Sequence, residues 1–217
     1  LINKIVGFNS HITVKSYDDS GIDLKKLDDK NLNLIANNLV FSNSGEAIIL
    51  KNNTSKGIVL RGYQSKEFSN LTIIKNDKFK GDRSKLSNNS ISIGNELSFS
   101  LDLKIGDKIT LMSPSGVETI VGSMPKQKTF EITSIFNSGL ADFDNNIALI
   151  NLDTLDVFFG FEQKDRNLEI YLKDPKNIES QKQIVQKIFD QEFIYTWADM
   201  NSSLFSALKV ERNVMFI

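Results

Sequence analysis

The chain has 217 residues, of which 40% are hydrophobic and 24% are charged, as is usual for a folded chain with one core or two small subdomains. Its formal net charge is −1, so the overall balance gives no reason to expect nucleic acid or an anionic membrane surface as a partner. The absence of cysteine excludes disulfides, thiol redox chemistry and cysteine-containing zinc sites.

No stretch approaches the ~20 apolar residues of a transmembrane helix, and no secretory signal pattern is present. The sequence lacks an initiator methionine and ends within an apolar pattern at residues 214–217. We therefore expect a fragment of a longer protein.

The N-terminal part predicts strands around one helix. Residues 11–16 are β-rich and alternate in part, which predicts a strand, and leucines near helical spacing predict a helix in 24–38. Ser44 and Gly45 carry turn chemistry, as do residues 52–57. Short strands are predicted between these separators at 40–41, 47–50 and 58–60.

In the middle of the chain, polar residues 76–89 predict a surface loop, and a short helix is predicted in 95–103. Residues 113–128 contain two prolines and two glycines, so we expect this segment not to be regular throughout. Strands are predicted at 108–112, 129–136 and 147–150.

The C-terminal part alternates helices and strands. A helix is predicted at 152–159, and strands are predicted at 168–172 and 193–197. Asp174 and Pro175 suit the start of a helix between these strands, and a final helix follows Asp199. Strands alternating with helices at both ends of a β-rich middle predict an α+β fold.

The sequence lacks the patterns of common catalysts. His11 is its one histidine, so a Ser-His-Asp triad would need it, and we expect a structural or surface role instead. Neither a G-x-S-x-G turn nor a Gly-Lys-Ser/Thr phosphate loop occurs. We therefore expect a chain that is not an enzyme and needs no cofactor.

Residues 142–146 have the D-x-D-x-N spacing of a calcium loop. The helix-loop-helix type requires glycine next and glutamate in the last position, where this chain has Ile147 and Asp153. We therefore expect a solvated turn before the following strand, and no metal site.

The proline-containing segment offers two features for binding. Residues 117–121 and Met124 are partly apolar, and in a loop such residues are either tucked under the fold or offered to a partner. Lys126, Gln127 and Lys128 form a small basic cluster, for which a solvated strand end is the alternative interpretation.

Several runs together resemble the lipoprotein-releasing ABC transporter permeases of the LolC/LolE type. Residues 7–12 are similar to their G-F-N-x-H-I run, and residues 93–109 to their I-G-x-x-L…G-D-x-I run. Residues 136–144 resemble F-x-S-G-x-Y-x-Y-D, and residues 197–215 match W-x-x-x-N-x-x-F-x-A-L-x-x-E-x-x-M. The order of these runs and their coverage from residue 7 to residue 215 make the joint resemblance specific.

The resemblance implies the fold of MacB-like periplasmic domains, in which an α/β porter part is built from both chain ends and a β-rich sabre part is inserted. The expected porter-like subdomain comprises residues 1–90 and 153–217. The expected sabre-like subdomain comprises residues 91–152 and carries a protruding hairpin, the hook.

The resemblance also implies a function. The permeases act at the periplasmic face of the bacterial inner membrane, extract lipoproteins and pass them to the periplasmic chaperone LolA. A separate LolD-like ATPase drives the process through the full-length protein, and a second permease copy or paralogue completes the transporter. Nucleic acid is not an expected partner.

The family's chaperone-binding residues map onto one segment of this chain. A polar and basic pad maps onto Gln127 and Lys128. The family's arginine is replaced by Thr110, and no proline stands at the expected hook tip. The hook maps onto Pro114, Val117, Thr119, Ile120, Val121, Gly122, Met124 and Pro125.

Alternatives remain open at this point. The subunit could be LolC-like, LolE-like or a homodimeric LolF-like permease. It could instead be the ectodomain of a MacB-like efflux permease or of an FtsX-like regulator of wall hydrolases. An enzyme would need a constellation around His11 that the sequence does not display.

Overall fold

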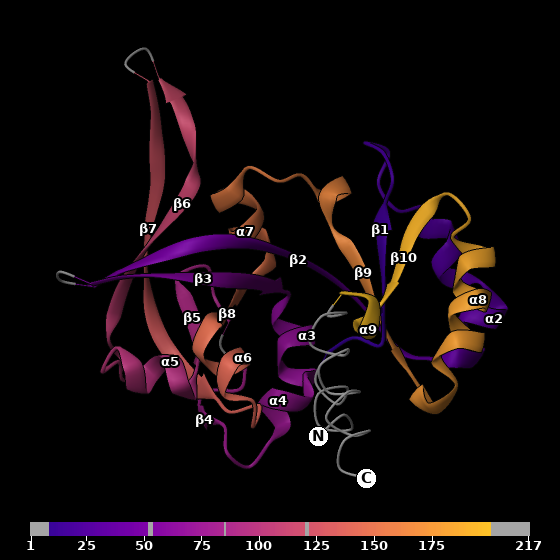
Figure 1. Cartoon of the computed structure of the whole chain (residues 1–217), viewed down its shortest axis with the longest axis horizontal. Helices are drawn as coiled ribbons and strands as arrows, with labels where there is room; N and C mark the ends of the chain where they lie inside the picture. Colours follow the sequence, from indigo (N-terminus) through magenta and orange to yellow (C-terminus); the bar gives the residue numbers. More distant parts are fainter. Residues whose placement is uncertain (1–8, 52–53, 85, 120–121, 201–217) are drawn as a thin grey trace, which may run out of the picture. The chain divides into compact units, whose positions relative to one another are not determined.

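This computed structural model describes residues 9–51, 54–84, 86–119 and 122–200, and for residues 114–119, 122–123 and 200 it describes the backbone alone. The described chain divides into two compact units (Figure 1). The larger comprises Phe41–Arg166, and the smaller combines Asn9–Val40 with residues 167–200. None of the helices in these described ranges is long and apolar enough to cross a membrane.

The smaller unit contains an antiparallel sheet with helices beside it. Strand β1 (Ile12–Ser16) pairs with both β9 (Asn167–Leu172) and β10 (Glu192–Thr196). Helices α2 (Lys30–Ile35) and α8 (Ile178–Ile188) pack beside each other (Figure 1). The sheet and the helices share a buried core made of Ile12, Val14, Leu32, Leu168, Ile170, Leu172, Val185 and Phe189.

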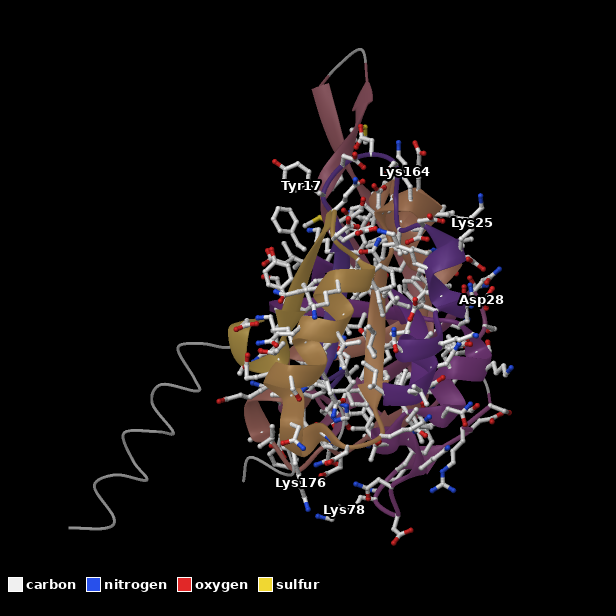
Figure 2. The ribbon with its side chains drawn as sticks, turned by 90° about the vertical axis from the view of Figure 1, so that its right-hand side faces the viewer. Tyr17, Lys25, Asp28, Lys78, Lys164 and Lys176 are labelled. Atoms are coloured by element: carbon white, nitrogen blue, oxygen red, sulfur yellow. The ribbon has the colours of Figure 1, made fainter. Side chains whose placement is uncertain are left out.

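Aromatic side chains lie on the exposed side of this small sheet. Tyr17 directly follows β1 and is 71% exposed, and Figure 2 shows it at the molecular surface. Its ring centroid lies 5.0 Å from that of Phe193, which in turn lies 6.1 Å from that of Tyr195. Phe193 and Tyr195 occupy alternate positions of β10, so the pleat of the strand places both on one face.

The larger unit contains a sheet that closes on itself. Each neighbouring pair along the path β2-β3-β8-β5-β7-β6 is hydrogen-bonded, and β6 returns to β2. Closure leaves the paired part of the sheet without a free edge. The strands are β2 (Ala36–Lys51), β3 (Thr54–Tyr63), β5 (Ser90–Gly94), β6 (Lys108–Thr119), β7 (Gly122–Phe136) and β8 (Ile147–Asn151). A short strand, β4 (Lys80–Gly81), pairs with β7.

Alternation along the strands fills the closed sheet. Every strand of the closed path contributes a pair of buried apolar residues spaced by two positions, as the pleat requires. These pairs are Ala47 and Ile49, Ile58 and Leu60, Ile91 and Ile93, Ile109 and Leu111, Phe130 and Ile132, and Ala148 and Ile150. Leu97, Leu155 and Phe158 extend the same cluster from two helices.

Short helices connect the strands. In the larger unit these are α3 (Ser65–Asn70), α4 (Thr72–Lys75), α5 (Asn95–Ser100), α6 (Ala141–Asn146), α7 (Leu152–Phe159) and the 3-10 turn Gln163–Asp165. The smaller unit adds the 3-10 turns Leu24–Asp28 and Pro175–Asn177, and the helix α9 (Trp197–Met200). The mixture of helices and strands confirms the predicted α+β class.

The predicted turn at Ser44 and Gly45 is wrong, because β2 runs through both residues without interruption. The physical reason is close packing. A Cβ atom at Gly45 would lie 2.7 Å from the ring of Phe159, so the small residue makes room for an aromatic ring. The helix predicted in 24–38 is also too long, since α2 ends at Ile35 and β2 begins at the next residue.

Residues 113–128 are more regular than their prolines and glycines suggested. They form the distal parts of β6 and β7, which pair in antiparallel fashion. The register shifts between Met112 and Gly116, so irregularity is confined to that short stretch. Proline has no backbone N–H to donate to a neighbouring strand. It is compatible with these strands because no further strand pairs with their outer edges among the described residues.

The predicted turn at 142–146 is wrong, because residues 141–146 form α6. Asp144 is only 2% exposed, and its carboxylate oxygens accept hydrogen bonds from the backbone N–H of Ser138 at 2.9 and 3.1 Å. Burial raises the pKa of Asp144 above its usual value, and these hydrogen bonds oppose the rise. The acidic side chain therefore fixes the loop before α6.

The compact units part at residues 40/41 and 166/167, whereas the expected porter-like and sabre-like subdomains part at 90/91 and 152/153. Strand β3 lies before residue 90, yet it pairs with β8 in the closed sheet. The assignment of the two subdomains stays a prediction.

Candidate partner-binding arm

The hook segment is a β-hairpin, defined here as the arm: residues 114–119 of β6 and 122–127 of β7. Its register pairs Gly116 with Pro125, Val117 with Met124 and Thr119 with Gly122. Figure 1 shows the arm extending from the closed sheet past β2 and β3. Ile120 and Val121 lie outside the described residues.

The arm has two outer backbone edges. Strand β2 pairs with β6 only at Thr110–Met112, and β5 pairs with β7 only from Glu131 onward. Within the described ranges, no other strand pairs with the outer edge of residues 114–119 or 122–127. Unpaired strand edges are templates onto which another chain can add a strand.

The predicted hook residues lie on this arm, except for Ile120 and Val121, which are outside the described residues. For Pro114, Val117, Thr119 and Gly122 the structure gives the backbone position only. Met124 is 61% exposed and Pro125 is also exposed. Met124 therefore offers a flexible apolar side chain to a partner.

The predicted pad residues lie at the base of the arm, where Gln127 is its last residue on β7 and Lys128 follows. Gln127 is exposed and Lys128 is half-buried. The Lys128 ammonium lies 5.5 Å from the ring centroid of Phe130, a cation–π distance. Lys126 Nζ donates a hydrogen bond to the carbonyl oxygen of Val157, at 3.1 Å. Alternation places Lys126, Lys128 and Phe130 on the same face of β7.

A hollow of about 560 Å³ adjoins the pad. The strand β7, the helix α7 and the loop before β5 form its walls. Its lining comprises Asn88, Lys126, Gln127, Lys128, Asp153, Thr154, Val157 and Phe158. The structure thus brings both pad residues together with residues that sequence reasoning did not select.

Val157 is the most informative of these missed residues. It is 75% exposed, although the neighbouring Leu155 and Phe158 belong to the buried core. The signal was available in the sequence, because an apolar residue four positions after Asp153 falls on the polar face of the predicted helix.

Thr110 occupies the position where the resemblance implies an arginine. Its Oγ1 lies 3.0 Å from Oγ1 of Thr129, its cross-strand neighbour. This neutral pair adds no charge beside the arm, so the positive charge at the base of the arm on β7 comes from Lys126 and Lys128.

His11 has a structural position in the smaller unit. It is half-buried, and its Nδ1 accepts a hydrogen bond from the backbone N–H of Leu172 at 2.8 Å. Desolvation lowers the pKa of His11 below its usual value, so the neutral ring is favoured in the fold. His11 thus links β1 to β9.

We expect stability to depend on His11 protonation. Its pKa is lower in the folded than in the unfolded state, so the stability it contributes is present above the unfolded pKa of about 6.5 and is lost as pH falls through the folded pKa. An NMR titration of the one imidazole should give a pKa below 6.5, and His11→Gln should flatten the fall in denaturation midpoint between pH 7 and 5. An imidazole pKa above 6.5 would contradict this.

The expected absence of a metal site stays a prediction. Among the described residues, no three or more histidine, aspartate or glutamate side chains come together as a cation site. Asp144, the centre of the calcium-like run, instead accepts hydrogen bonds from Ser138.

Comparison with solved structures defines the class of the fold. The chain superposes on the periplasmic region of MacB from Actinobacillus actinomycetemcomitans with a TM-score of 0.50 and 12% identity, covering 93% of this chain and 95% of that one. It superposes equally, at 0.50 and 12%, on the extracellular domain of the noncanonic ABC-type transporter YknZ from Gram-positive bacteria, covering 87% and 100%. The chain therefore has a MacB-like periplasmic domain fold.

Sequence comparison narrows this class. No family model matches the chain. It is 27% identical over 129 residues to the lipoprotein-releasing system transmembrane protein LolC of Neisseria meningitidis serogroup B, 24% identical to that of Xylella fastidiosa and 26% identical to that of Buchnera aphidicola. The matches cover 58–59% of this chain and 31–32% of the relatives, so the chain spans about a third of their length. In sequence the chain is thus similar to part of LolC, and in fold it is similar to the periplasmic region of MacB.

Proposed function

We propose that this chain serves a lipoprotein-releasing ABC transporter at the periplasmic face of the bacterial inner membrane by recruiting the chaperone LolA through the arm. The full-length permease passes lipoproteins to that chaperone. A separate LolD-like ATPase supplies the energy, and a second permease copy or paralogue completes the complex. The chain itself is not a catalyst.

The observation that carries the proposal is the arm with its two unpaired edges. An exposed strand edge can add to the sheet of a partner, and backbone hydrogen bonds then supply affinity without a preformed pocket. Met124 adds apolar contact area at this edge. Lys126 and Lys128 lie at the base of the arm, where charge mainly speeds encounter and sets orientation.

The proposal is tested by removing the distal arm. We expect deletion of residues 117–123 to weaken binding of a LolA-type chaperone to this chain at least tenfold, which corresponds to about 1.4 kcal/mol. Isothermal titration calorimetry measures the affinity, and circular dichroism checks that the closed sheet persists. Leu34→Glu is a control, because Leu34 is exposed on α2 in the other unit.

Unchanged affinity after the deletion would refute the role of the arm. Binding of a membrane-fusion protein in place of the chaperone would favour a MacB-like efflux permease instead.

A further inference from the structure

The hollow beside the pad has a wall that the proposed hook and pad do not include. Asp153 and Val157 are four residues apart on α7, so they form one row on the exposed face of the helix. Val157 contributes exposed apolar surface, and across the hollow β7 contributes Lys126 and Lys128. An apolar contact point and two ammonium groups therefore share one concave surface.

The acidic residue of this row, Asp153, bonds to other side chains than the two lysines. The carboxylate of Asp153 accepts hydrogen bonds from Gln64 Nε2 at 3.0 Å and from Arg166 Nη2 at 2.5 Å. These bonds lower the pKa of Asp153, and neither of them involves Lys126 or Lys128.

Lys126 and Lys128 differ in how they are held. Lys126 Nζ donates to the Val157 carbonyl near the C-terminal end of α7, where a cation is favourable. Lys128 lies over the Phe130 ring and forms no ion pair with a carboxylate within the described part of the chain. The hollow thus presents two ammonium groups that form no ion pair with a carboxylate among the described residues.

We propose that this hollow receives a carboxylate side chain, flanked by an apolar side chain, from the same protein that the arm binds. The apolar side chain packs on Val157, and the carboxylate lies between Lys126 and Lys128. This inference rests on the proposed function and adds α7 as a second contact surface for the partner.

Continuity with the arm favours this occupant over an unrelated ligand. Strand β7 runs without interruption from Met124 on the arm to Lys128 in the hollow. A partner strand paired with the arm is therefore carried toward α7. A contact at both places fixes the orientation of the partner, which edge pairing alone does not.

A charge pair at position 157 tests the proposal. Val157→Glu and Val157→Lys remove the same apolar contact but place opposite charges in the hollow. We expect Val157→Glu to weaken chaperone binding at least tenfold, because the new carboxylate repels the incoming one and competes for the lysines. Val157→Lys should weaken it several-fold less. Thermal unfolding of both variants checks that α7 is intact.

Salt dependence supplies a second readout. Lys128→Gln should reduce the loss of affinity between 50 and 300 mM salt (roughly the range over which surface charges become screened), because one charge pair across the interface is removed. Leu34→Glu, which adds a carboxylate far along the chain on α2, should leave both affinity and salt dependence unchanged.

The outcomes separate this inference from the proposed function. Loss of binding on arm deletion, together with normal binding by both Val157 variants, would overturn the inference and leave the role of the arm standing. If Val157→Glu and Val157→Lys weakened chaperone binding equally, the proposal that the hollow receives a carboxylate would be wrong. Failure of the unaltered chain to bind the chaperone would overturn both.

Discussion

Replacing Gly94 with alanine should destabilise the larger unit by about 3 kcal/mol, an overpacking penalty at the upper end of the usual range. Gly94 ends β5, and a Cβ there would lie 2.0 Å from the backbone carbonyl oxygen of Asp144 in α6. The clash is with backbone, so no side-chain rotation relieves it. α6 cannot shift freely either, because the buried Asp144 carboxylate holds the Ser138 N–H.

Chemical denaturation with the intrinsic fluorescence or circular dichroism signal measures this loss. Gly57→Ala is the matched control, because a Cβ at Gly57 meets nothing within 4 Å. It should change the free energy of unfolding by less than about 1 kcal/mol. No clash destabilises this variant, and alanine reduces the conformational entropy of the unfolded chain, which slightly favours the folded state. Equal denaturation midpoints for the two variants would contradict the prediction, because they would show that α6 moves to accommodate the new Cβ atom.

Arg166→Met should cost about 2 kcal/mol at pH 7, less than the roughly 3–5 kcal/mol for breaking a fully buried ion pair, because Asp153 is largely exposed. Arg166 is 14% exposed in its side chain, and its Nε donates to Oδ2 of the buried Asp156 at 2.7 Å. Methionine keeps most of the volume, but among the described side chains it leaves Asp156 just one long hydrogen bond, from Asn43 at 3.5 Å.

The cost should depend on pH. Burial already raises the pKa of Asp156, and the bonds from Arg166 oppose that rise. Without Arg166 the folded-state pKa rises further above the unfolded one, so the penalty is present at neutral pH and fades as the carboxyl becomes protonated. The deficit should therefore shrink from pH 7 toward pH 4.

A neighbouring exposed pair is the control for this experiment. Lys164 forms an ion pair with Glu162 at 3.5 Å, and Figure 2 shows Lys164 at the surface. Lys164→Met should change stability by no more than about 0.5 kcal/mol, as expected for a solvated pair. A larger effect for Lys164 than for Arg166 would contradict the importance of the buried network.

Segments with clear periodicity were predictable. The helix predicted at 152–159 is α7 with the same bounds, because Leu152, Leu155 and Phe158 recur at helical spacing and face the core. The strand predicted at 168–172 is β9, extended by one residue. Asp174 caps the turn that leads into α8, as the Asp-Pro pair indicated, by accepting from the Lys176 N–H at 3.1 Å.

Long-range packing was not predictable from local patterns. Ser44 and Gly45 have the composition of a turn, but Gly45 lacks a side chain because its position faces the ring of Phe159, which is distant in the sequence. Closure of the sheet also depends on pairing between β2 and β6, distant strands whose register no local pattern encodes.

The candidate site was predictable only as a segment. The apolar character of residues 117–121 and the basic cluster at 126–128 drew attention to the correct stretch of chain. The hollow was missed because it needs α7 beside β7, and two elements separated by α6 and β8 meet only in the folded unit.

The unpaired edges of the arm also favour self-association. An edge that accepts a foreign strand also accepts the same edge of a second molecule, which is a route to aggregation. Lys126 and Lys128 would face their own counterparts in such a pairing, and like charges disfavour it. The same lysines that attract a partner thus act as gatekeepers, and concentrated salt weakens that protection.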